Sequence, residues 1–447
     1  MITALIGRTF LEKYNQEMRS SHSSKSFFEE VFFELFFNHP KYLMSGGNSS
    51  FENPKISWDK MIKGLIPFET CEQKKLRLEK FIEKVSDNYN KPDASFALGY
   101  AASTEREFAT TSGLVSDLKI ETTEEEVYYS WIGGGLGIGV AGGYNLLIDD
   151  AIILWQVFLG WKEYRKLLND PTLSVIRGNQ INTWNGQWLT YSLGKDFDRA
   201  FDYTVLRKKE ILKIEKDKAE VNTVNWSNLF FSLSNLYAEQ TINTYVYSFG
   251  QTNKTIGFIP MYLKSGKRLI DVFKQLFPYS EDSFETSQFQ SLFGIHIKRA
   301  CELGNIGLHA LQPESLKKYI NTDKNLSFKK EEDYINYRTY KTWLIAMISK
   351  NKQEITDYTA QIAQLLLEYR KDAKGNERTN LINKRLFEES SKKSFIGALT
   401  DMLSGVTDKQ AKELKELRDY VHLLSNEDFS YFRTLLKFDY AFVEKEN

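Results

Sequence analysis

Two aspartates and a lysine in the N-terminal third have the types and spacing that metal-dependent hydrolysis of a phosphodiester requires. Asp93 stands near the start of a predicted strand, and Asp117 and Lys119 lie in a second one, Gly113–Ile120. Residues two apart in a strand point to the same face, so Asp117 and Lys119 would lie together. The two carboxylates would bind Mg²⁺ or Mn²⁺, which activates water and stabilises charge on phosphorus. Lys119 would orient or deprotonate the attacking water.

The order of elements around these residues resembles the core of the PD-(D/E)xK nucleases. A helix carboxylate, Glu29 or Glu30, precedes two predicted strands and a helix within residues 25–170. The resemblance implies that Asp93 and Asp117 are metal ligands and that Lys119 is catalytic with them. An exposed strand pair with an ordinary Asp–Lys contact is the alternative interpretation of the same residues.

Amide and indole side chains are concentrated in the segment Arg177–Trp188, RGNQINTWNGQW. Amides can hydrogen-bond bases or sugars, indoles can stack on bases, and an arginine can contact a phosphate. The same residues can instead hydrogen-bond a long loop to its own backbone through Asx turns. On the first interpretation, we expect a ligand-binding loop to which six residues contribute: Arg177, Asn179, Asn182, Trp184, Asn185 and Trp188.

Upstream of this segment, the run Gly-Leu-Gly-Ile-Gly-Val predicts a strand with one bare face. Gly135, Gly137 and Gly139 would form that face. Glycine weakens a strand unless another group must approach closely. A ligand, a nucleic-acid backbone or another segment of the protein would therefore fill it. An acidic pair follows and can cap a buried helix predicted over Ala151–Leu168.

The sequence lacks three common site motifs. Gly266-Lys267 is followed by Arg268 and not by Ser or Thr, so no P-loop is predicted. The alternating glycines lie within a predicted strand and not in a turn that opens a helix, so the match to a dinucleotide fingerprint is weak. The histidines are scattered without zinc-ligand spacing.

Charge and cysteine content limit the classes of function. The 447 residues include 59 Lys or Arg and 59 Asp or Glu, so any nucleic-acid contact must depend on a local basic patch. Two distant cysteines, Cys71 and Cys301, fit a reducing cytosol and exclude a disulfide scaffold. The uncharged run Val127–Ile148 has acidic flanks and no basic flank, so we expect no membrane span.

The patterns predict an α+β N-terminal region with an all-helical C-terminal domain. Strand signals vanish after about Phe328, where helical periodicity takes over. A charged helix is expected over Val205–Glu220. The predicted domains are a mixed α/β region over 1–125, a glycine-strand and helix/hairpin region over 126–325, and a helical bundle over 326–447.

These features lead to three hypotheses about function. The first is a cytoplasmic protein that binds nucleic acid, DNA or RNA, through the glycine strand and the Arg177–Trp188 segment. Large subunits of prokaryotic defence complexes combine a mixed α/β part with a helical C-terminal bundle, so an antiviral role is expected by analogy of fold. The second is the Mg²⁺- or Mn²⁺-dependent nuclease, and no other cofactor is predicted. The third is a scaffold that binds protein partners through its C-terminal helices and no nucleic acid.

Overall fold

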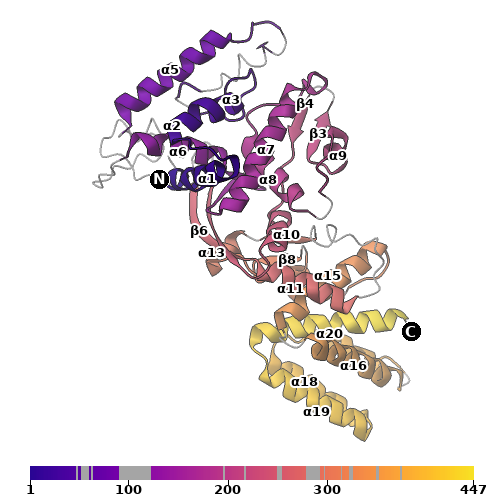
Figure 1. Ribbon diagram of the computed structural model, residues 1–447. Coiled ribbons are helices and arrows are strands. Elements are labelled where there is room, and N and C mark those ends of the chain that lie inside the picture. Colours follow the sequence, from indigo (N-terminus) through magenta and orange to yellow (C-terminus); the bar gives the residue numbers. More distant parts are fainter. Residues whose placement is uncertain are drawn as a thin grey trace. The chain divides into compact units, whose positions relative to one another are not determined.

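The structure, a computed structural model (Figure 1), describes residues 1–46, 49–51, 60–61, 64–89, 122–194, 197–215, 218–248, 254–277, 292–295, 297–313, 315–321, 326–348, 352–372 and 375–446. The chain divides into two units. The first unit comprises Met1–Tyr237 and Thr241–Met261, and the second comprises Ala238–Gln240 and Tyr262–Asn447.

The predicted class, α+β with a helical C-terminal part, is confirmed. The largest sheet lies in the N-terminal and middle regions, and every described element from Glu331 onward is helical. In the described ranges, no helix combines the length and the apolar character needed to cross a bilayer.

In the first unit, α1 (Ile2–Met18) and α6 (Glu124–Gly135) pack with their backbones almost in contact. A Cβ atom added to Gly133 would collide with the carbonyl oxygen of Thr3, and one added to Gly7 would collide with the carbonyl oxygen of Tyr129. Glycine at both crossing positions therefore permits this close approach.

The strand predicted from Gly135 begins later than expected. Helix α6 continues to Gly135, β1 covers Ile138–Val140, and β2 covers Tyr144–Ile148. The helix prevails over the alternating pattern because Val127 and Trp131, one turn apart, are both buried on its packed face. The prediction that Gly135 and Gly137 belong to a strand is therefore wrong, and Gly139 alone of the three glycines lies in β1.

Strand β2 pairs antiparallel with β1 on one side and with β5 (Thr241–Ser248) on the other. The last strand of this sheet, β6 (Lys254–Tyr262), lies beside β5. A separate hairpin of β3 (Leu212–Glu215) and β4 (Lys218–Val221) occupies part of the segment predicted as a charged helix.

That helix prediction, over Val205–Glu220, is wrong except at its start. Only α9 (Tyr203–Lys208) is helical there. The sequence Leu-Lys-Ile-Glu of β3 alternates apolar and charged residues, which is a strand period and not a helical one.

Aromatic side chains form the core between α1, α6, α7 (Ala151–Asn169) and the helical segment Ser24–Phe36. This segment consists of α2 (Ser24–Phe27), a short π-helix η1 (Phe28–Phe32) and α3 (Phe33–Phe36). The ring of Trp161 in α7 lies 4.7 Å from that of Phe36 and 5.8 Å from that of Phe10, centroid to centroid. These contacts fix α7 against the N-terminal helices.

The other helices of the unit are α5 (Cys71–Asn88), η4 (Pro171–Leu173), α8 (Ile181–Ser192) and α10 (Trp226–Leu236).

In the second unit, α20 (Asn426–Glu446) packs against α15 (Glu331–Ile348) and α16 (Lys352–Lys371). The carboxylate of Asp439 is buried at this junction. It accepts hydrogen bonds from Lys341 Nζ at 2.6 Å, Tyr337 Oη at 2.9 Å and Thr359 Oγ1 at 2.7 Å. The other elements are α11 (Lys264–Leu276), β7 (Phe293–Ile295), α13 (Ile297–Leu303), β8 (Leu311–Pro313), α14 (Lys317–Asn321), α17 (Glu377–Asn380), η5 (Leu381–Leu386), α18 (Lys392–Met402), η6 (Leu403–Gly405) and α19 (Asp408–Leu423).

Candidate functional site

Helix α8 of the same unit covers Gly137 and Gly139, and the rings of Phe32 and Phe36 cover Gly135. Two amide side chains of α8 hold the glycine segment by its carbonyl groups. Asn182 Nδ2 donates to Gly137 O at 3.0 Å, and Asn185 Nδ2 donates to Gly135 O and Gly137 O, both at 2.8 Å. Two of the polar residues predicted to bind a ligand, Asn182 and Asn185, therefore bind the neighbouring backbone.

Close packing leaves no room for a ligand at these glycines. A Cβ atom on Gly139 would lie 2.9 Å from the backbone carbonyl of Asn182, and one on Gly137 would lie 2.5 Å from the hydroxyl of Tyr247. A Cβ atom on Gly135 would lie 2.9 Å from the ring of Phe36. The sequence left three candidates for the group that covers the glycine face: a ligand, a nucleic-acid backbone or another segment of the protein. The structure shows that other segments of the protein cover it.

The two tryptophans predicted for base stacking lie in the interior. Trp184 is fully buried and Trp188 is 4% exposed. Their indole N–H groups donate to backbone carbonyls of α7, that of Trp184 to Gly160 at 2.7 Å and that of Trp188 to Gln156 at 2.8 Å. The expectation of a loop over these residues is also wrong, because α8 is a helix that buries both indoles on one face.

Arg177 and Asn179 differ from the rest of the segment because they stay at the surface. The Asn179 backbone has a left-handed φ of 58°, and its N–H donates to the carbonyl of Tyr42 at 2.7 Å. Gly178 allows this approach, since a Cβ atom there would lie 2.6 Å from the same carbonyl. Arg177 forms a half-exposed ion pair with Glu220 at 3.0 Å.

Beneath this surface loop lies Lys41, a residue that the sequence analysis did not select. Its Nζ donates to Ser174 O at 2.6 Å and to Ile176 O at 2.8 Å. The guanidinium of Arg165 in α7 in turn donates to Lys41 O at 3.0 Å and to Leu35 O. Backbone carbonyls, which carry no net charge, satisfy these donors.

We call the group formed by His39, Lys41, Lys74, Arg165 and Arg177 the basic junction. Lys41, Lys74 and Arg165 are 7–8% exposed. In the described part of the chain, none of these three forms an ion pair with a carboxylate. The nearby carboxylate of Glu69, which accepts from Tyr42, is paired with Arg77 at 2.5 Å.

Burial and mutual repulsion shift the pKa values within the basic junction. Burial, helped by the charge of Arg165, lowers the pKa of Lys41 to about 8. Burial lowers the pKa of Arg165 to about 10. The pKa of His39 is lowered to about 4 by burial and by the charges of Arg165, Lys74 and Lys41. At neutral pH, His39 is therefore neutral while Lys41 and Arg165 remain charged.

The residues of the predicted nuclease site, Asp93, Asp117 and Lys119, lie outside the described residues. The proposed helix carboxylate Glu30 lies at the surface, 3.8 Å from the ring of His22. Among the described residues, no group of three or more His, Cys, Asp or Glu side chains is arranged to hold a metal ion. The Mg²⁺ or Mn²⁺ site therefore stays a prediction.

One sequence signal for the basic junction was present at Arg165. It stands in the apolar stripe of α7, one turn after Trp161 and before Leu168, where a charged residue is unusual. No comparable signal marks Lys41, because its burial depends on Ser174 and Ile176, which are far away in the sequence.

No protein-family model, curated protein or solved structure matches the chain.

Proposed function

We propose that this protein binds nucleic acid through the basic junction. The observation that supports the proposal is the burial of Lys41, Lys74 and Arg165 without a carboxylate partner among the described residues. Buried charges in proteins are usually paired, because desolvation penalises an isolated one. A phosphate group would supply the missing negative charge.

The surface residues of the junction provide the contacts that the buried cations cannot make. Arg177 presents a guanidinium suited to bidentate contact with a phosphate, although Glu220 competes for it. Asn179 is exposed and has an amide that can donate to or accept from a base or sugar. The buried cations would raise the positive potential at these two residues.

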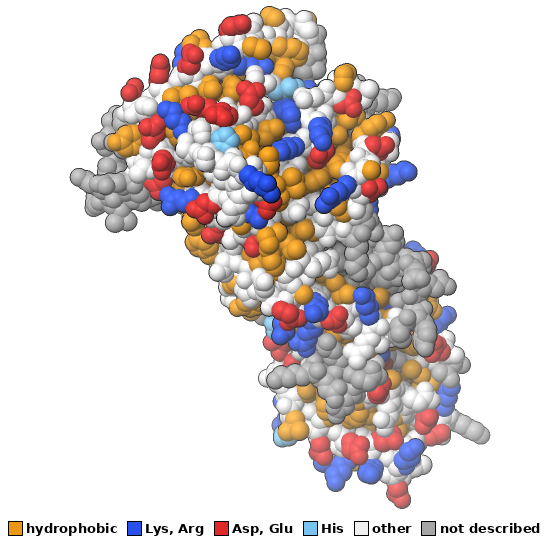
Figure 2. All heavy atoms as spheres, in the orientation of Figure 1, with side chains coloured by type: hydrophobic (Ala, Val, Ile, Leu, Met, Phe, Trp, Pro, Cys, Tyr) orange, Lys and Arg blue, Asp and Glu red, His pale blue; other side chains and the backbone are white. Residues whose placement is uncertain are grey.

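This mode of binding fits a protein without net charge. On the face that Figure 2 shows, Lys and Arg side chains are interspersed with Asp and Glu over both units. A local patch on such a surface makes a few phosphate contacts, so affinity should be modest and sensitive to salt. The proposal includes a cytoplasmic location and, by analogy of fold, a role as a subunit of a prokaryotic defence complex.

The mixed surface also favours a second candidate, a scaffold that binds protein partners through its C-terminal helices and no nucleic acid. Interspersed charges without a continuous basic stripe are typical of a protein surface that does not track a phosphate backbone. The metal-dependent nuclease is a third proposal, which depends on residues outside the described ranges.

Fluorescence anisotropy with labelled single-stranded DNA and RNA, with and without Mg²⁺ or Mn²⁺, separates these proposals. Binding that weakens steeply with salt and weakens further in Arg177→Ala supports the basic junction. Cleavage that requires the metal supports the nuclease. Failure of both DNA and RNA to bind at low salt would reject the first proposal and favour the scaffold.

A further inference from the structure

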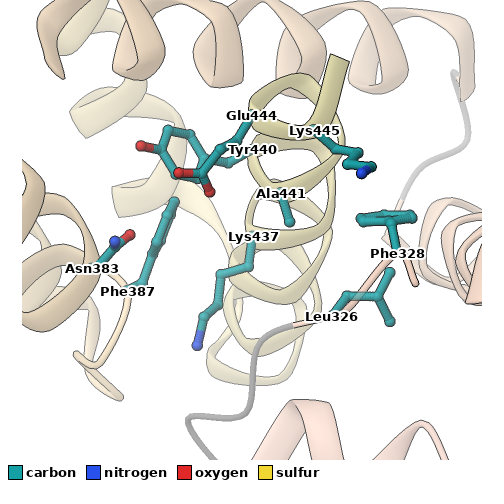
Figure 3. Close-up of a pocket in the computed structure, with 9 residues that line it drawn as sticks. All are labelled: Leu326, Phe328, Asn383, Phe387, Lys437, Tyr440, Ala441, Glu444 and Lys445. Carbon is teal, nitrogen blue, oxygen red and sulfur yellow. The ribbon is translucent and has the colours of Figure 1, made fainter. Parts of the chain in front are cut away.

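A pocket of about 300 Å³ lies on one face of α20 in the second unit (Figure 3). Residues one turn apart on that helix contribute to it, including Lys437, Ala441 and Lys445. The segment before α15 supplies Leu326 and Phe328, and η5 with the residue after it supplies Asn383 and Phe387. This volume is at the lower end of the range of known small-molecule sites.

Apolar and polar side chains line the pocket on both sides of Ala441. Figure 3 shows Leu326 and Phe328 on one side of the small alanine side chain. Both are buried, at 8% and 9% exposure. Their side chains and the methyl group of Ala441 offer a surface on which a planar ring can pack. Asn383, Lys437 and the buried ring of Phe387 lie on the other side.

The charged residues of the lining, Lys437, Lys445 and Glu444, give it a net positive formal charge. Lys437 and Lys445 supply two ammonium groups. The lining carboxylate, Glu444, is ion-paired with Arg370, so its charge is already neutralised. Asn383 adds an amide that both donates and accepts hydrogen bonds. The lining therefore suits a ligand that combines a planar apolar group with a negative charge.

We propose that this pocket binds a nucleotide. The base packs on the side formed by Leu326, Phe328 and Ala441, and the phosphate lies at Lys437 and Asn383. The ligand is either a free nucleotide or a nucleotide within a single strand, since both present the same base and phosphate. This inference goes beyond the proposed function, because the pocket and the basic junction are separate sites in different units.

Isothermal titration of the full chain with AMP, adenosine and inorganic phosphate tests the site. AMP should bind more tightly than either of its parts. Ala441→Phe fills the space between the two sides and should abolish binding of AMP and adenosine. Lys437→Met should weaken AMP binding by about tenfold or more through loss of a charge-assisted hydrogen bond, with adenosine unaffected. Lys412→Met, an exposed position on α19 outside the pocket, is the matched control and should change nothing.

A short oligo(dA) distinguishes the two sources of the ligand. If Ala441→Phe weakens binding of AMP, the pocket accepts a free nucleotide; if it weakens only oligo(dA) binding, the nucleotide belongs to a strand. Circular dichroism and thermal unfolding establish whether each variant folds. If one of the pocket variants does not fold, Asn383→Leu, at a half-buried position, is used in its place. Failure of both AMP and oligo(dA) to bind the wild type, or equal binding by wild type and Ala441→Phe, would overturn the inference. Arg177→Ala should leave AMP binding unchanged, so failure of the pocket and failure of the basic junction are distinguishable.

Discussion

Gly186 of α8 lies directly against the carbonyl oxygen of Gly139 in β1, closer than any residue with a Cβ atom could approach. The helix that carries the amide and indole residues and the glycine strand are thus two halves of one internal contact. Each lacks side-chain bulk at the point where the other approaches. The features that the sequence offers as two parts of a binding surface instead cover each other.

The first prediction concerns the glycine face. Gly137→Val would drive its side chain against Asn182 and the Tyr247 hydroxyl. It should lower the free energy of unfolding by about 1–3 kcal/mol through overpacking. Urea denaturation measures the change. Gly397→Ala is the control, because nothing lies within 4 Å of a Cβ atom there. That helical position should be unaffected, or stabilised by up to about 1 kcal/mol. Unchanged stability in Gly137→Val together with lost ligand binding would contradict the internal contact.

The second prediction concerns Trp184. Its ring is fully buried and its N–H donates to Gly160 O. Trp184→Ala should therefore destabilise the protein by about 3–5 kcal/mol. Acrylamide should quench a variant that retains only Trp184 less than one that retains only Trp155, which is partly exposed. Efficient quenching of Trp184 in the free protein would show that the indole is accessible, against the structure.

The third prediction concerns the buried pair Lys341 and Asp439. Lys341→Met leaves the carboxylate, which is 2% exposed, without its cation. The free energy of unfolding should fall by about 3–5 kcal/mol. The double variant Lys341→Met with Asp439→Leu should recover much of that loss, because no unpaired charge stays buried. A double variant as unstable as the sum of the two single variants would show that the pair does not act as a unit.

The fourth prediction is a pH dependence set by His39. Its pKa is about 4 in the folded protein, against 6.5 as the ordinary value. Between these values, the unfolded chain binds more protons than the folded chain, so stability falls as the pH falls from 6.5 towards 4. His39→Gln should flatten this part of the stability–pH curve measured by urea denaturation. An unchanged curve would show that burial and the neighbouring cations do not lower the pKa of His39.

Much of the helical architecture was predictable from local patterns. The buried helix expected over Ala151–Leu168 is observed over Ala151–Asn169, and Asp150 accepts hydrogen bonds from the first-turn amides. Helical periodicity over residues 408–424 likewise corresponds to α19 (Asp408–Leu423), where Thr407 caps the first turn. In both, capping residues and 3.6-residue periodicity agree, so the local signal is sufficient.

The candidate site was not predictable in the same way. Glycines at 135, 137 and 139 indicate correctly that something approaches closely, but glycine carries no information on which segment approaches. The burial of Lys41 depends on contacts with Ser174 and Ile176, which are more than 130 residues away in the sequence. Packing between residues so far apart produces no periodic pattern in the sequence from which the burial of Lys41 could be predicted.

The salt dependence of nucleic-acid binding tests the central claim most directly. For each variant, the affinity for a single strand is measured between about 50 and 200 mM salt. Arg177→Ala should make the plot of log affinity against log salt shallower by about 0.7, the value of one phosphate contact. Lys74→Gln removes a buried charge that makes no phosphate contact, so it should weaken binding by lowering the local positive potential. Lys80→Gln, at an exposed position on the same helix as Lys74, is the matched control and should keep the wild-type affinity and slope. Equal slopes for wild type and Arg177→Ala, or no binding at about 50 mM salt, would contradict the proposal that the basic junction binds nucleic acid.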